Sequence, residues 1–332
     1  MTNANSSPMD VLCLRPQADF ERAGALAPAS LHVAYRALTD EDVPALMKSA
    51  RALVIPAVGA PIPPALFEGA SLKLVQVTGA GLDRLDQATL KRLGIPVANV
   101  PGGSNGAVAE YAVTTASLLS RRFSWSDAEI RNGNYVPYRA KLLAANVAGL
   151  DGLLVGVVGF GMIGLAVARR FHAMGCRICY FDPAPRDPQA ARELSAESLS
   201  LEELLKTADI VTLHVPLLPA TKGLLGDSQL AAMKPGAVLI QASRGGIVDE
   251  AALAKHLQSG HIGGAAIDVY STEPPAMDNP LLALQGEAAR RLLFTPHIAG
   301  VTRQATTFLC RSAWRNVERV LLENEPPLDR AY

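Results

Sequence analysis

The stretch LLVGVVGFGMIGLAVARRFHAMGCRICYFD, residues 153–182, contains a complete strand–turn–helix–strand unit. The apolar run Leu153–Val158 is typical of a strand that is buried on both faces. Glycine then recurs with the spacing G-x-G-x-x-G, at Gly159, Gly161 and Gly164. After an amphipathic helical segment, a second apolar run, Ile178–Phe181, leads into Asp182. The order and spacing of these parts predict a parallel α/β fold.

Glycines at these three positions suit a turn that binds a dinucleotide. Gly159 permits the tight turn, Gly161 lets the backbone approach a pyrophosphate, and Gly164 allows close packing of helix on strand. The first helical residues, Met162 and Ile163, present free N–H groups and a partial positive charge to the phosphates. We therefore predict that a dinucleotide binds here.

Asp182 indicates which dinucleotide binds. A carboxylate at the end of the second strand accepts hydrogen bonds from a ribose 2′-hydroxyl and repels a 2′-phosphate, which favours NAD over NADP. Arg186 follows four residues later, and an arginine there could accommodate the 2′-phosphate. NAD is the predicted cofactor, with NADP as the alternative.

Length and composition narrow the class of protein. A chain of 332 residues suggests two domains. Its 31 basic residues balance its 31 acidic residues, so no net field favours nucleic acid as a partner. No apolar run reaches the roughly 18 residues of a membrane span. The N-terminal segment MTNANSSPMD lacks the features of a secretory signal, and we expect a short disordered tail there.

Four cysteines in a chain of this length do not make a disulfide framework. Cys176 and Cys179 form C-x-x-C, which could indicate redox or metal chemistry. Residues three apart on a strand point to opposite faces, and no second C-x-x-C completes a zinc site. We therefore expect buried, reduced thiols, no metal site, and a cytoplasmic protein.

Short apolar runs alternate with helical patterns in the first hundred residues. Strands are predicted at Val11–Leu14, Leu31–Tyr35, Ala52–Ile55, Leu72–Val77 and Val97–Val100. Helices are predicted at Phe20–Leu26, Asp40–Ala50, Pro64–Glu68 and Asp86–Leu93. This alternation predicts a second, smaller parallel sheet.

The middle of the chain continues the same alternation. After a break at Pro101–Gly103, a long helix is predicted from Asn105 to about Ile130, followed by a loop at Asn132–Pro137. Further strands are predicted at Ile210–Val215, Ala237–Gln241, Gly264–Asp268 and Leu292–Phe294. Further helices are predicted at Leu201–Thr207, Ser228–Met233, Glu250–Gln258 and Gln304–Leu322, the last of which could cover the first domain. The predicted fold is α/β with two doubly wound parallel sheets, residues 104–300 being inserted into a domain of residues 1–103 and 301–332.

Three predicted strands end in residues that carry chemistry. Arg244 follows one strand, Glu273 the next and His297 the last. Because ligands bind beyond the carboxyl ends of strands in open α/β sheets, we expect these side chains at one rim. Each alone has an ordinary structural interpretation, but their joint occurrence favours a functional site.

Hydride transfer explains why these residue types would occur together. Reduction of a ketone needs a proton donor at the carbonyl oxygen, and the reverse reaction needs a base; histidine can be both near neutral pH. A glutamate on the other ring nitrogen fixes the tautomer, and an arginine binds a carboxylate through two hydrogen bonds. These residues predict a dehydrogenase acting on an acid that contains a carbonyl or hydroxyl group.

Five motifs also suggest a family: VGFGMIG, HVPLLPAT, SRGGIVDE, AIDVYSTEP and TPHIAG. In order and spacing they resemble those of the D-isomer-specific 2-hydroxyacid dehydrogenases, and the resemblance extends from about Val11 to Leu328. It implies a Rossmann NAD-binding domain inserted into a flavodoxin-like substrate domain. It also implies a homodimer and the interconversion of a small D-2-hydroxy acid and its 2-keto acid.

The resemblance also implies roles for single residues. His297 is the implied acid/base, Glu273 its partner, Arg244 the group that orients the substrate, and Asp268 the carboxylate that holds the nicotinamide amide. Arg244 and His297 are implied to contact both substrate and cofactor. Other implied cofactor contacts are His214, Pro216, Thr221, Ala242, Ser243 and Gly300. The implied substrate-carboxylate loop is Thr78, Gly79, Ala80 and Gly81.

Departures from the family pattern bear on the substrate. Pro56–Gly59 stands where many relatives carry an arginine or serine, which makes a phosphorylated substrate less expected. Met162 replaces a polar residue of the glycine turn, and Gly286–Arg291 lengthens the loop before the histidine strand. A formate or phosphite dehydrogenase on the same scaffold, or a dinucleotide-sensing interaction protein resembling a corepressor, remains an alternative.

Overall fold

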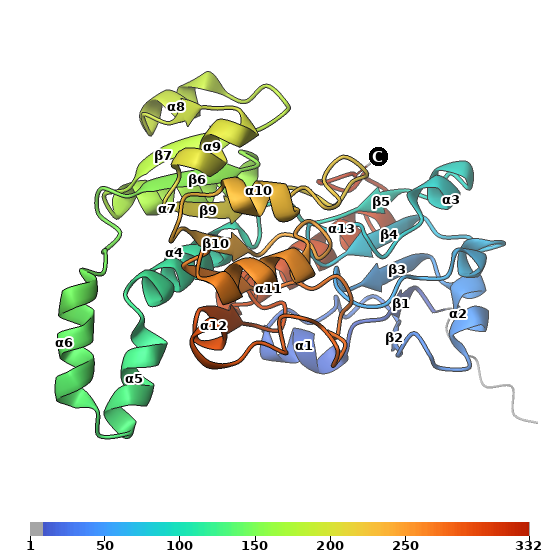
Figure 1. Ribbon diagram of the computed structural model, residues 1–332. Helices are drawn as coiled ribbons and strands as arrows, with labels where there is room; N and C mark the ends of the chain where they lie inside the picture. The colour runs from blue at the N-terminus through green and yellow to red at the C-terminus, as the bar shows by residue number, and fades with distance from the viewer. Residues whose placement is uncertain (1–8, 332) are drawn as a thin grey trace, which may run out of the picture. The chain divides into compact units, whose positions relative to one another are not determined.

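The computed structural model describes residues 9–331, so the tail expected at the N-terminus lies largely outside the described residues. The chain folds as two compact units (Figure 1). Unit 1 consists of Met1–Ser104 and Val301–Tyr332, and unit 2 of Asn105–Gly300. Each unit is built on its own parallel sheet with helices on both faces. None of the helices in residues 9–331 combines the length and apolarity that a bilayer crossing needs.

The sheet of unit 1 has five parallel strands in the order β2-β1-β3-β4-β5. The strands are β1 (Val11–Cys13), β2 (Val33–Tyr35), β3 (Ala52–Ile55), β4 (Leu74–Val77) and β5 (Val97–Ala98). The residues of β1, β3 and β4 are buried throughout, as expected of apolar strands covered on both faces. This strand order is that of flavodoxin-like folds, which confirms the prediction for this part of the chain.

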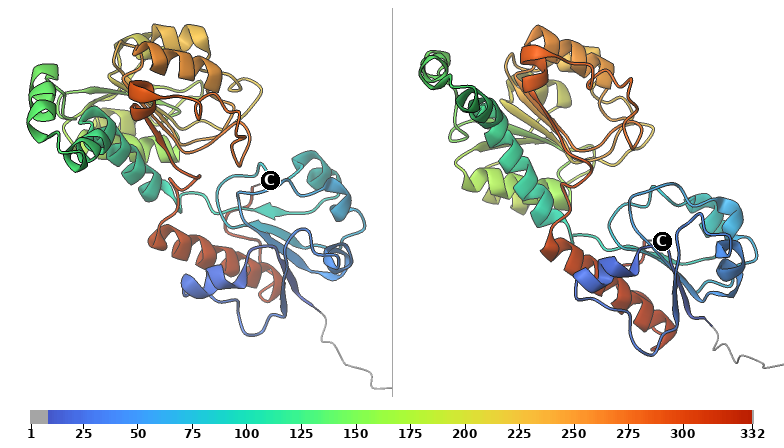
Figure 2. Two further views of the ribbon diagram at one scale, coloured as in Figure 1. Left: turned by 60° about the horizontal axis from the view of Figure 1, so that its bottom comes forward. Right: turned by 90° about the horizontal axis from the view of Figure 1, so that it is seen from below.

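Two sets of helices cover the unit 1 sheet (Figure 2). The helices on one face are α1 (Gln17–Arg22) and α13 (Arg303–Leu321). Phe20 of α1 and Trp314 of α13 pack with their ring centroids 5.1 Å apart, so the last helix does cover this sheet. The elements on the other face are α2 (Val43–Ser49), the 3₁₀ helix η1 (Pro64–Phe67) and α3 (Gln87–Arg92).

The sheet of unit 2 has seven parallel strands in the order β12-β11-β10-β9-β6-β7-β8. The strands are β6 (Leu154–Val158), β7 (Arg177–Phe181), β8 (Glu197–Ser198), β9 (Ile210–Leu213), β10 (Val238–Gln241), β11 (Gly264–Ile267) and β12 (Leu292–Phe294). Apart from the edge strand β12, this is the strand order of the Rossmann fold, reversing between β6 and β9. The predicted doubly wound architecture is confirmed; β8 is a short edge strand that the sequence did not predict.

Helices also cover both faces of the unit 2 sheet. Those on one face are α4 (Asn105–Ser120), α7 (Met162–Ala173) and α8 (Pro188–Glu193). Those on the other are α9 (Leu201–Thr207), α10 (Asp227–Ala232) and α11 (Glu250–Ser259).

The two thiols of the C-x-x-C segment lie in different cores of unit 2. Cys176 belongs to the core beneath α4 and α7, and Cys179 to the core beneath α9 to α11, so the predicted divergence is confirmed. Both are unpaired, and burial raises the pKa of Cys176 to about 11 and that of Cys179 to about 12. Such thiols are unreactive. Residues 9–331 contain no group of three or more His, Cys, Asp or Glu side chains that could hold a metal ion.

Two predictions for the segment between residues 105 and 145 are wrong. The long helix ends at Ser120, because Arg122 takes a left-handed conformation (φ 56°) and α5 (Phe123–Arg131) then begins separately. The predicted loop at Asn132–Pro137 contains the start of another helix, α6 (Tyr135–Ala145). Pro137 is tolerated there because it lies in the first turn, where backbone N–H groups have no helical partner.

Most of the segment Gly286–Arg291, predicted to lengthen a loop, forms a short helix, α12 (Gly286–Arg290). This helix binds to α5 and α6. An oxygen of Glu129 lies 2.7 Å from Nη1 of Arg290, and Lys141 Nζ lies 3.3 Å from Glu287 Oε1. The indole N–H of Trp125 also donates to the Arg290 carbonyl. The segment therefore anchors the α5–α6 pair to unit 2.

Candidate functional site

The glycine turn of unit 2 follows β6 and leads into α7. Gly159 has φ 91°, and a Cβ atom there would lie 2.5 Å from the His214 carbonyl oxygen. A Cβ atom on Gly164 would lie 1.9 Å from the Gly159 carbonyl oxygen. Both positions therefore require glycine. Gly161 instead faces open space, as a position that lets a pyrophosphate approach the backbone should.

The first turn of α7 completes an anion site. The N–H groups of Met162 and Ile163 donate to no group in the described part of the chain. Because α7 has 12 residues, its aligned peptide dipoles add a partial positive charge at this end. The turn and helix terminus therefore fit the pyrophosphate of a dinucleotide.

Asp182 lies just beyond the end of β7, where a ribose would be recognised. Its carboxylate accepts hydrogen bonds from the Phe160 N–H (2.7 Å) and the Ala184 N–H (2.9 Å). Arg186 binds both carboxylate oxygens, through Nε at 2.7 Å and Nη2 at 2.9 Å. Although burial opposes ionisation, these hydrogen bonds, chiefly the one from Arg186, hold the pKa of Asp182 below its usual value. Arg186 is thus bound to the predicted ribose-recognising carboxylate.

The segment after β9 forms the opposite wall of the glycine turn. Burial lowers the pKa of His214 to about 3, so its ring is neutral, and Nε2 lies 2.8 Å from Thr212 Oγ1. The predicted cofactor residues Pro216 and Thr221 are joined directly, because the threonine hydroxyl donates to the proline carbonyl at 2.6 Å. This bond closes the loop over residues 216–221.

The turn that carries Arg244 follows β10 and includes Ala242 and Ser243. The buried Gln241 side chain donates to the Arg244 carbonyl at 2.8 Å and accepts from the Ser243 hydroxyl at 2.7 Å. A Cβ atom on Gly245 would lie 1.7 Å from the Tyr270 carbonyl oxygen. The Arg244 turn therefore packs directly against the segment that leads to Glu273.

His297 and Glu273 are brought together as a hydrogen-bonded pair. Nδ1 of the histidine lies 2.8 Å from Oε2 of the glutamate, and Oε1 accepts from the Tyr270 N–H at 3.1 Å. Their side chains are 24% and 30% exposed, so the pair remains accessible to a small molecule. Because Nδ1 faces the carboxylate, Nε2 is the ring atom available for proton exchange.

Asp268 holds the backbone around His297. Its carboxylate accepts from the N–H groups of Ile298 (2.8 Å) and Ala299 (2.9 Å), and its carbonyl accepts from the His297 N–H (2.8 Å). The Thr295 hydroxyl donates to the same carboxylate at 2.6 Å. These bonds maintain the left-handed conformation of His297 (φ 55°), just before Gly300. A carboxylate has about four acceptor sites, so one remains for the predicted nicotinamide contact.

Sequence reasoning missed the outer part of this network. Tyr111, on α4, has its hydroxyl 2.9 Å from Thr295 Oγ1. Burial raises the pKa of Tyr111 above its usual value, so the phenol stays protonated and can donate. No local signal could indicate this contact, because 184 residues separate the two side chains in the sequence.

The predicted substrate loop, Thr78–Gly81, belongs to unit 1 and follows β4. The carbonyls of Gly79 and Ala80 accept from the Val100 N–H (2.8 Å) and the Asn99 side chain (2.7 Å). The N–H groups of Gly79, Ala80 and Gly81 have no partner among residues 9–331. Successive free N–H groups of this kind form a concave anion-binding backbone.

Two arginines that sequence reasoning missed lie beside this loop. Arg84 is buried and donates to the carbonyls of Pro56 (3.0 Å) and Ala60 (2.8 Å). Arg15 donates through Nη1 to the Thr78 hydroxyl at 2.9 Å. Although Pro56–Gly59 contains no arginine, two guanidinium groups from elsewhere in the sequence therefore lie at this end of the sheet.

These features define an α/β protein of the dinucleotide-binding dehydrogenase class. Residues 113–299 match the family described as "D-isomer specific 2-hydroxyacid dehydrogenase, NAD binding domain". The chain belongs to the D-isomer-specific 2-hydroxyacid dehydrogenase family, and unit 2 contains its NAD-binding domain. NAD is therefore the cofactor of this unit, as Asp182 predicted.

Individual relatives agree with this assignment. The chain is 37% identical to an (S)-sulfolactate dehydrogenase of Chromohalobacter salexigens, over 75% of this chain and 76% of that protein. It is 36% identical to a D-3-phosphoglycerate dehydrogenase of Archaeoglobus fulgidus over 71% of this chain, a match that spans only 42% of that protein. The TT0316 protein of Thermus thermophilus has a similar structure (TM-score 0.81, 32% identity, 98% of this chain and 100% of that one).

Proposed function

We propose that the protein is an NAD-dependent enzyme that interconverts a small D-2-hydroxy acid and its 2-keto acid. The observation that carries this proposal is the 2.8 Å contact between His297 Nδ1 and Glu273 Oε2 in the NAD-binding unit. The geometry leaves Nε2 for the substrate and gives the imidazolium a compensating charge. The pair favours catalysis over a role in binding alone.

In the proposed reaction, bound NADH supplies the hydride that the carbonyl carbon takes up. His297 donates its Nε2 proton to the carbonyl oxygen, and it takes that proton back when the hydroxy acid is oxidised. Glu273 holds the ring in one orientation and stabilises the imidazolium. Asp268 keeps the histidine backbone in its left-handed conformation through the bonds described above.

Two groups are proposed to bind the substrate carboxylate. The Arg244 guanidinium offers a planar fork of donors that matches a carboxylate. The N–H groups of Gly79, Ala80 and Gly81 offer further donors, and Thr78 carries a hydroxyl beside them. Unit 1 is accordingly proposed as the substrate domain.

The residues proposed to hold NAD surround the carboxyl ends of the unit 2 strands. Gly159, Gly161, Met162, Ile163 and Gly164 form the pyrophosphate turn, and Asp182 binds the ribose. The remaining proposed contacts are His214, Pro216, Thr221, Ala242, Ser243, Arg244, Asp268, His297 and Gly300.

A His297→Gln variant tests the proposal. We expect kcat with a responsive 2-keto acid to fall by about 10²–10⁴-fold, while the Kd of NADH stays near that of the wild type. His172→Gln, a change at an exposed histidine of α7, is the matched control and should leave both constants unchanged. Activity retained by His297→Gln would refute the assigned role.

The two alternatives make different predictions in the same assays. A formate or phosphite dehydrogenase would reduce NAD with those donors and would not oxidise NADH with 2-keto acids. A dinucleotide-sensing protein resembling a corepressor would bind NADH without turnover on any substrate of a broad panel. Either result would replace the proposed activity.

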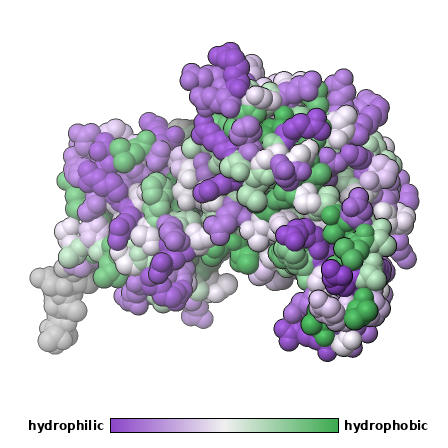
Figure 3. All heavy atoms as spheres, turned by 90° about the vertical axis from the view of Figure 1, so that its left-hand side faces the viewer, coloured by the Kyte–Doolittle hydropathy of each residue, from purple (hydrophilic) through white to green (hydrophobic). Residues whose placement is uncertain are grey.

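A homodimer is also proposed, through the pair of helices α5 and α6. Figure 3 shows hydrophobic side chains on the surface of the lobe that these helices form. The exposed apolar residues are Phe123, Ile130, Tyr135, Val136 and Leu143. Burial of such a patch between copies would remove apolar area from water. Light scattering should show a dimer that Val136→Asp converts to a monomer; Leu26→Asp, in unit 1, is the control.

A cytoplasmic location is proposed from the cysteines. Cys13, Cys176, Cys179 and Cys310 are all unpaired and buried. Free thiols in these numbers are usual in a reducing compartment. Fractionation of the source cells would test this location.

A further inference from the structure

The sheet of unit 1 has its own topological switch point, between β1 and β3. The chain leaves β1 toward β2 on one side and leaves β3 toward β4 on the other, as the order β2-β1-β3-β4-β5 shows. Open α/β sheets bind ligands in the crevice beyond the strands at such a point. Arg15 follows β1 by two residues, so a guanidinium group lies at the place where a ligand is expected.

Arg15 is held in a defined position there. Its Nε lies 3.0 Å from an Asp19 oxygen, and its Nη1 donates to the Thr78 hydroxyl at 2.9 Å. The side chain is only 16% exposed. Because Thr78 directly precedes the free N–H groups of Gly79 to Gly81, Arg15 brings a positive charge beside the loop proposed to bind the substrate carboxylate.

Arg15 also lines a cavity of about 430 Å³ within unit 1. The polar lining residues are Arg15, Asp19, Arg22, Thr302, Arg303 and Thr306. Their side chains combine three guanidinium groups with one carboxylate and two hydroxyls. The cavity is therefore of a size that suits a small molecule and carries an excess of positive charge.

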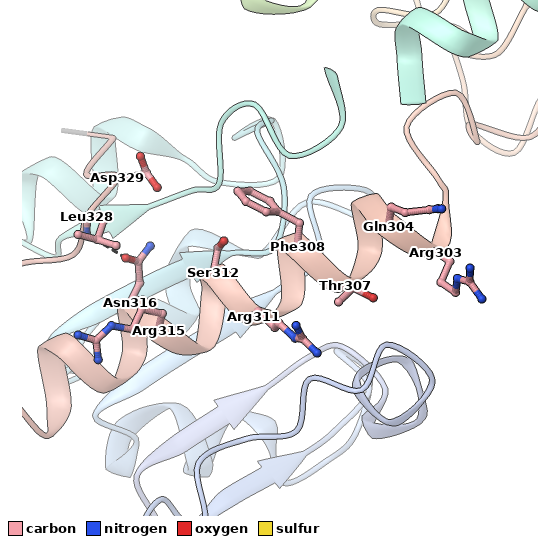
Figure 4. A pocket seen from close by; sticks show the side chains of 10 residues that line it. All are labelled: Arg303, Gln304, Thr307, Phe308, Arg311, Ser312, Arg315, Asn316, Leu328 and Asp329. Carbon is pink, nitrogen blue, oxygen red and sulfur yellow. Dashed lines mark hydrogen bonds between the residues drawn. The ribbon is translucent and has the colours of Figure 1, made fainter. Parts of the chain in front are cut away.

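The single carboxylate does not neutralise this lining. Asp19 pairs with both Arg15 and Arg22, whereas the Arg303 side chain makes no ion pair or hydrogen bond within the part of the chain that the structure describes. Figure 4 shows Arg303 leaving the first turn of α13, directed away from Phe308 in the adjoining groove. Three cations facing one anion leave two positive charges uncompensated, which favours an anionic occupant.

We propose that this cavity binds an oxyanion (a phosphate, sulfonate or carboxylate group) through Arg15, Arg22 and Arg303. Guanidinium groups bind such anions through paired, charge-assisted hydrogen bonds, and the threonine hydroxyls add neutral donors. The oxyanion is either a second acidic group on the substrate or a free anion. The first source rests on the proposed function, since it requires the substrate carboxylate to bind at Gly79–Gly81.

Titration of the full-length protein with inorganic phosphate, and separately with sulfate, tests the site itself. Calorimetry at constant ionic strength should show binding to the wild type, and Arg303→Gln and Arg22→Gln should each weaken it about tenfold. Arg311→Gln is the matched control, because Arg311 lies two turns further along α13 and outside this cavity. One contradicting result is equal affinity in all variants, and another is no binding to the wild type up to about 50 mM. Either result overturns the proposal, unless substitution of Arg303 raises KM only for keto acids with a second acidic group, as tested next.

Kinetics with NADH identify the source of the anion. Pyruvate has no second acidic group, whereas 3-sulfopyruvate and 3-phosphohydroxypyruvate carry one. If the anion is part of the substrate, Arg303→Gln raises KM about tenfold for the latter two and leaves that of pyruvate unchanged. If the anion is free, Arg303→Gln weakens phosphate binding but leaves the ratio of these KM values unchanged.

The anion titration and the kinetic experiment together also distinguish failure of this proposal from failure of the proposed function. A protein that reduces no 2-keto acid of a broad panel would refute the proposed dehydrogenase activity, and the phosphate titration would still decide the oxyanion site. Normal turnover of pyruvate, with neither phosphate binding nor a change in any KM on substitution of Arg303, would refute the oxyanion site alone.

Discussion

The turns Gly159–Gly164 in unit 2 and Thr78–Gly81 in unit 1 both follow buried parallel strands and both present free N–H groups, yet they are built differently. In the first, neighbouring backbone leaves no room for a side chain at Gly159 or Gly164, and a 12-residue helix follows. In the second, Asn99 and Val100 hold the loop carbonyls and so turn the N–H groups outward. A turn with free N–H groups can thus arise from local sterics or from distant hydrogen bonds.

The strongest test of the local mechanism is Gly164→Ala. Its Cβ atom would lie 1.9 Å from the Gly159 carbonyl oxygen, so the turn must move. We expect a loss of about 3 kcal/mol in the free energy of unfolding and a loss of NADH affinity of about 100-fold or more, roughly 3 kcal/mol. Chemical denaturation and NADH fluorescence titration measure the two effects.

Two other glycines serve as controls for Gly164→Ala. Gly106→Ala lies in α4 with open space around its Cβ, so stability should be unchanged or slightly higher. Gly161→Ala should fold normally and lose NADH affinity, because its Cβ would occupy only the space proposed for the pyrophosphate. Normal NADH binding by Gly164→Ala would refute the steric explanation.

The distant mechanism is tested by Asn99→Ala. Removal of the 2.7 Å hydrogen bond to the Ala80 carbonyl should free the loop Thr78–Gly81, which is proposed to bind the substrate, to rotate. One hydrogen bond contributes about 1 kcal/mol, so we expect KM for the keto acid to rise by about 5- to 10-fold. The Kd of NADH should not change, and Asn134→Ala, an exposed change in unit 2, should alter neither constant. A rise in the Kd of NADH alone would contradict the assignment of the loop.

A smaller effect is expected at the ribose end of the cofactor site. Arg186→Ala removes the guanidinium that pairs with both Asp182 oxygens, so the carboxylate repels a 2′-phosphate more strongly. We expect the preference for NADH over NADPH to increase about fivefold, and Asp182→Ala to reduce that preference. Binding titrations with both cofactors measure it. A decrease of this preference in Arg186→Ala would show that Arg186 does not help the site to accommodate a 2′-phosphate.

The smallest effect is a pH dependence of stability that arises from His214, whose carbonyl lies against Gly159. The pKa of its ring is about 3 in the folded protein and near 6.5 when unfolded. Between these values the unfolded chain binds a proton that the folded chain does not, so stability falls as pH falls. We expect the wild type to lose about 0.7 kcal/mol more than His214→Gln between pH 7 and pH 6. Urea unfolding at both pH values measures this, and parallel losses would contradict a buried neutral ring.

The strands were the most predictable part of the fold. All apolar runs predicted as strands form strands, because a segment covered on both faces must be continuously apolar. The helices α5 and α6 were not predicted correctly, since a left-handed Arg122 and a proline in a first turn have no reliable local signal. Their boundaries depend on packing against α12, which comes about 150 residues later in the sequence.

The candidate site likewise has features that the sequence predicts and features that it does not. The glycine turn, Asp182 and the pairing of Glu273 with His297 follow from local spacing and from the rule that parallel strands end at one rim. The hydrogen bonds of Thr295, Tyr111 and Asn99 could not be predicted, because a hydrogen bond between distant segments produces no periodic pattern in the sequence of either segment. The same is true of the contact between Arg15 and Thr78 and of those of Arg84, which join residues 24 or more positions apart.

By itself the amino-acid sequence determined the doubly wound fold, the dinucleotide turn and the residues that could exchange a proton, because each depends on sterics or periodicity within a short segment. The folded chain alone decided which carbonyls are occupied and which N–H groups remain free. It also decided where the arginines gather, because these features depend on segments that meet only after the sheets have formed.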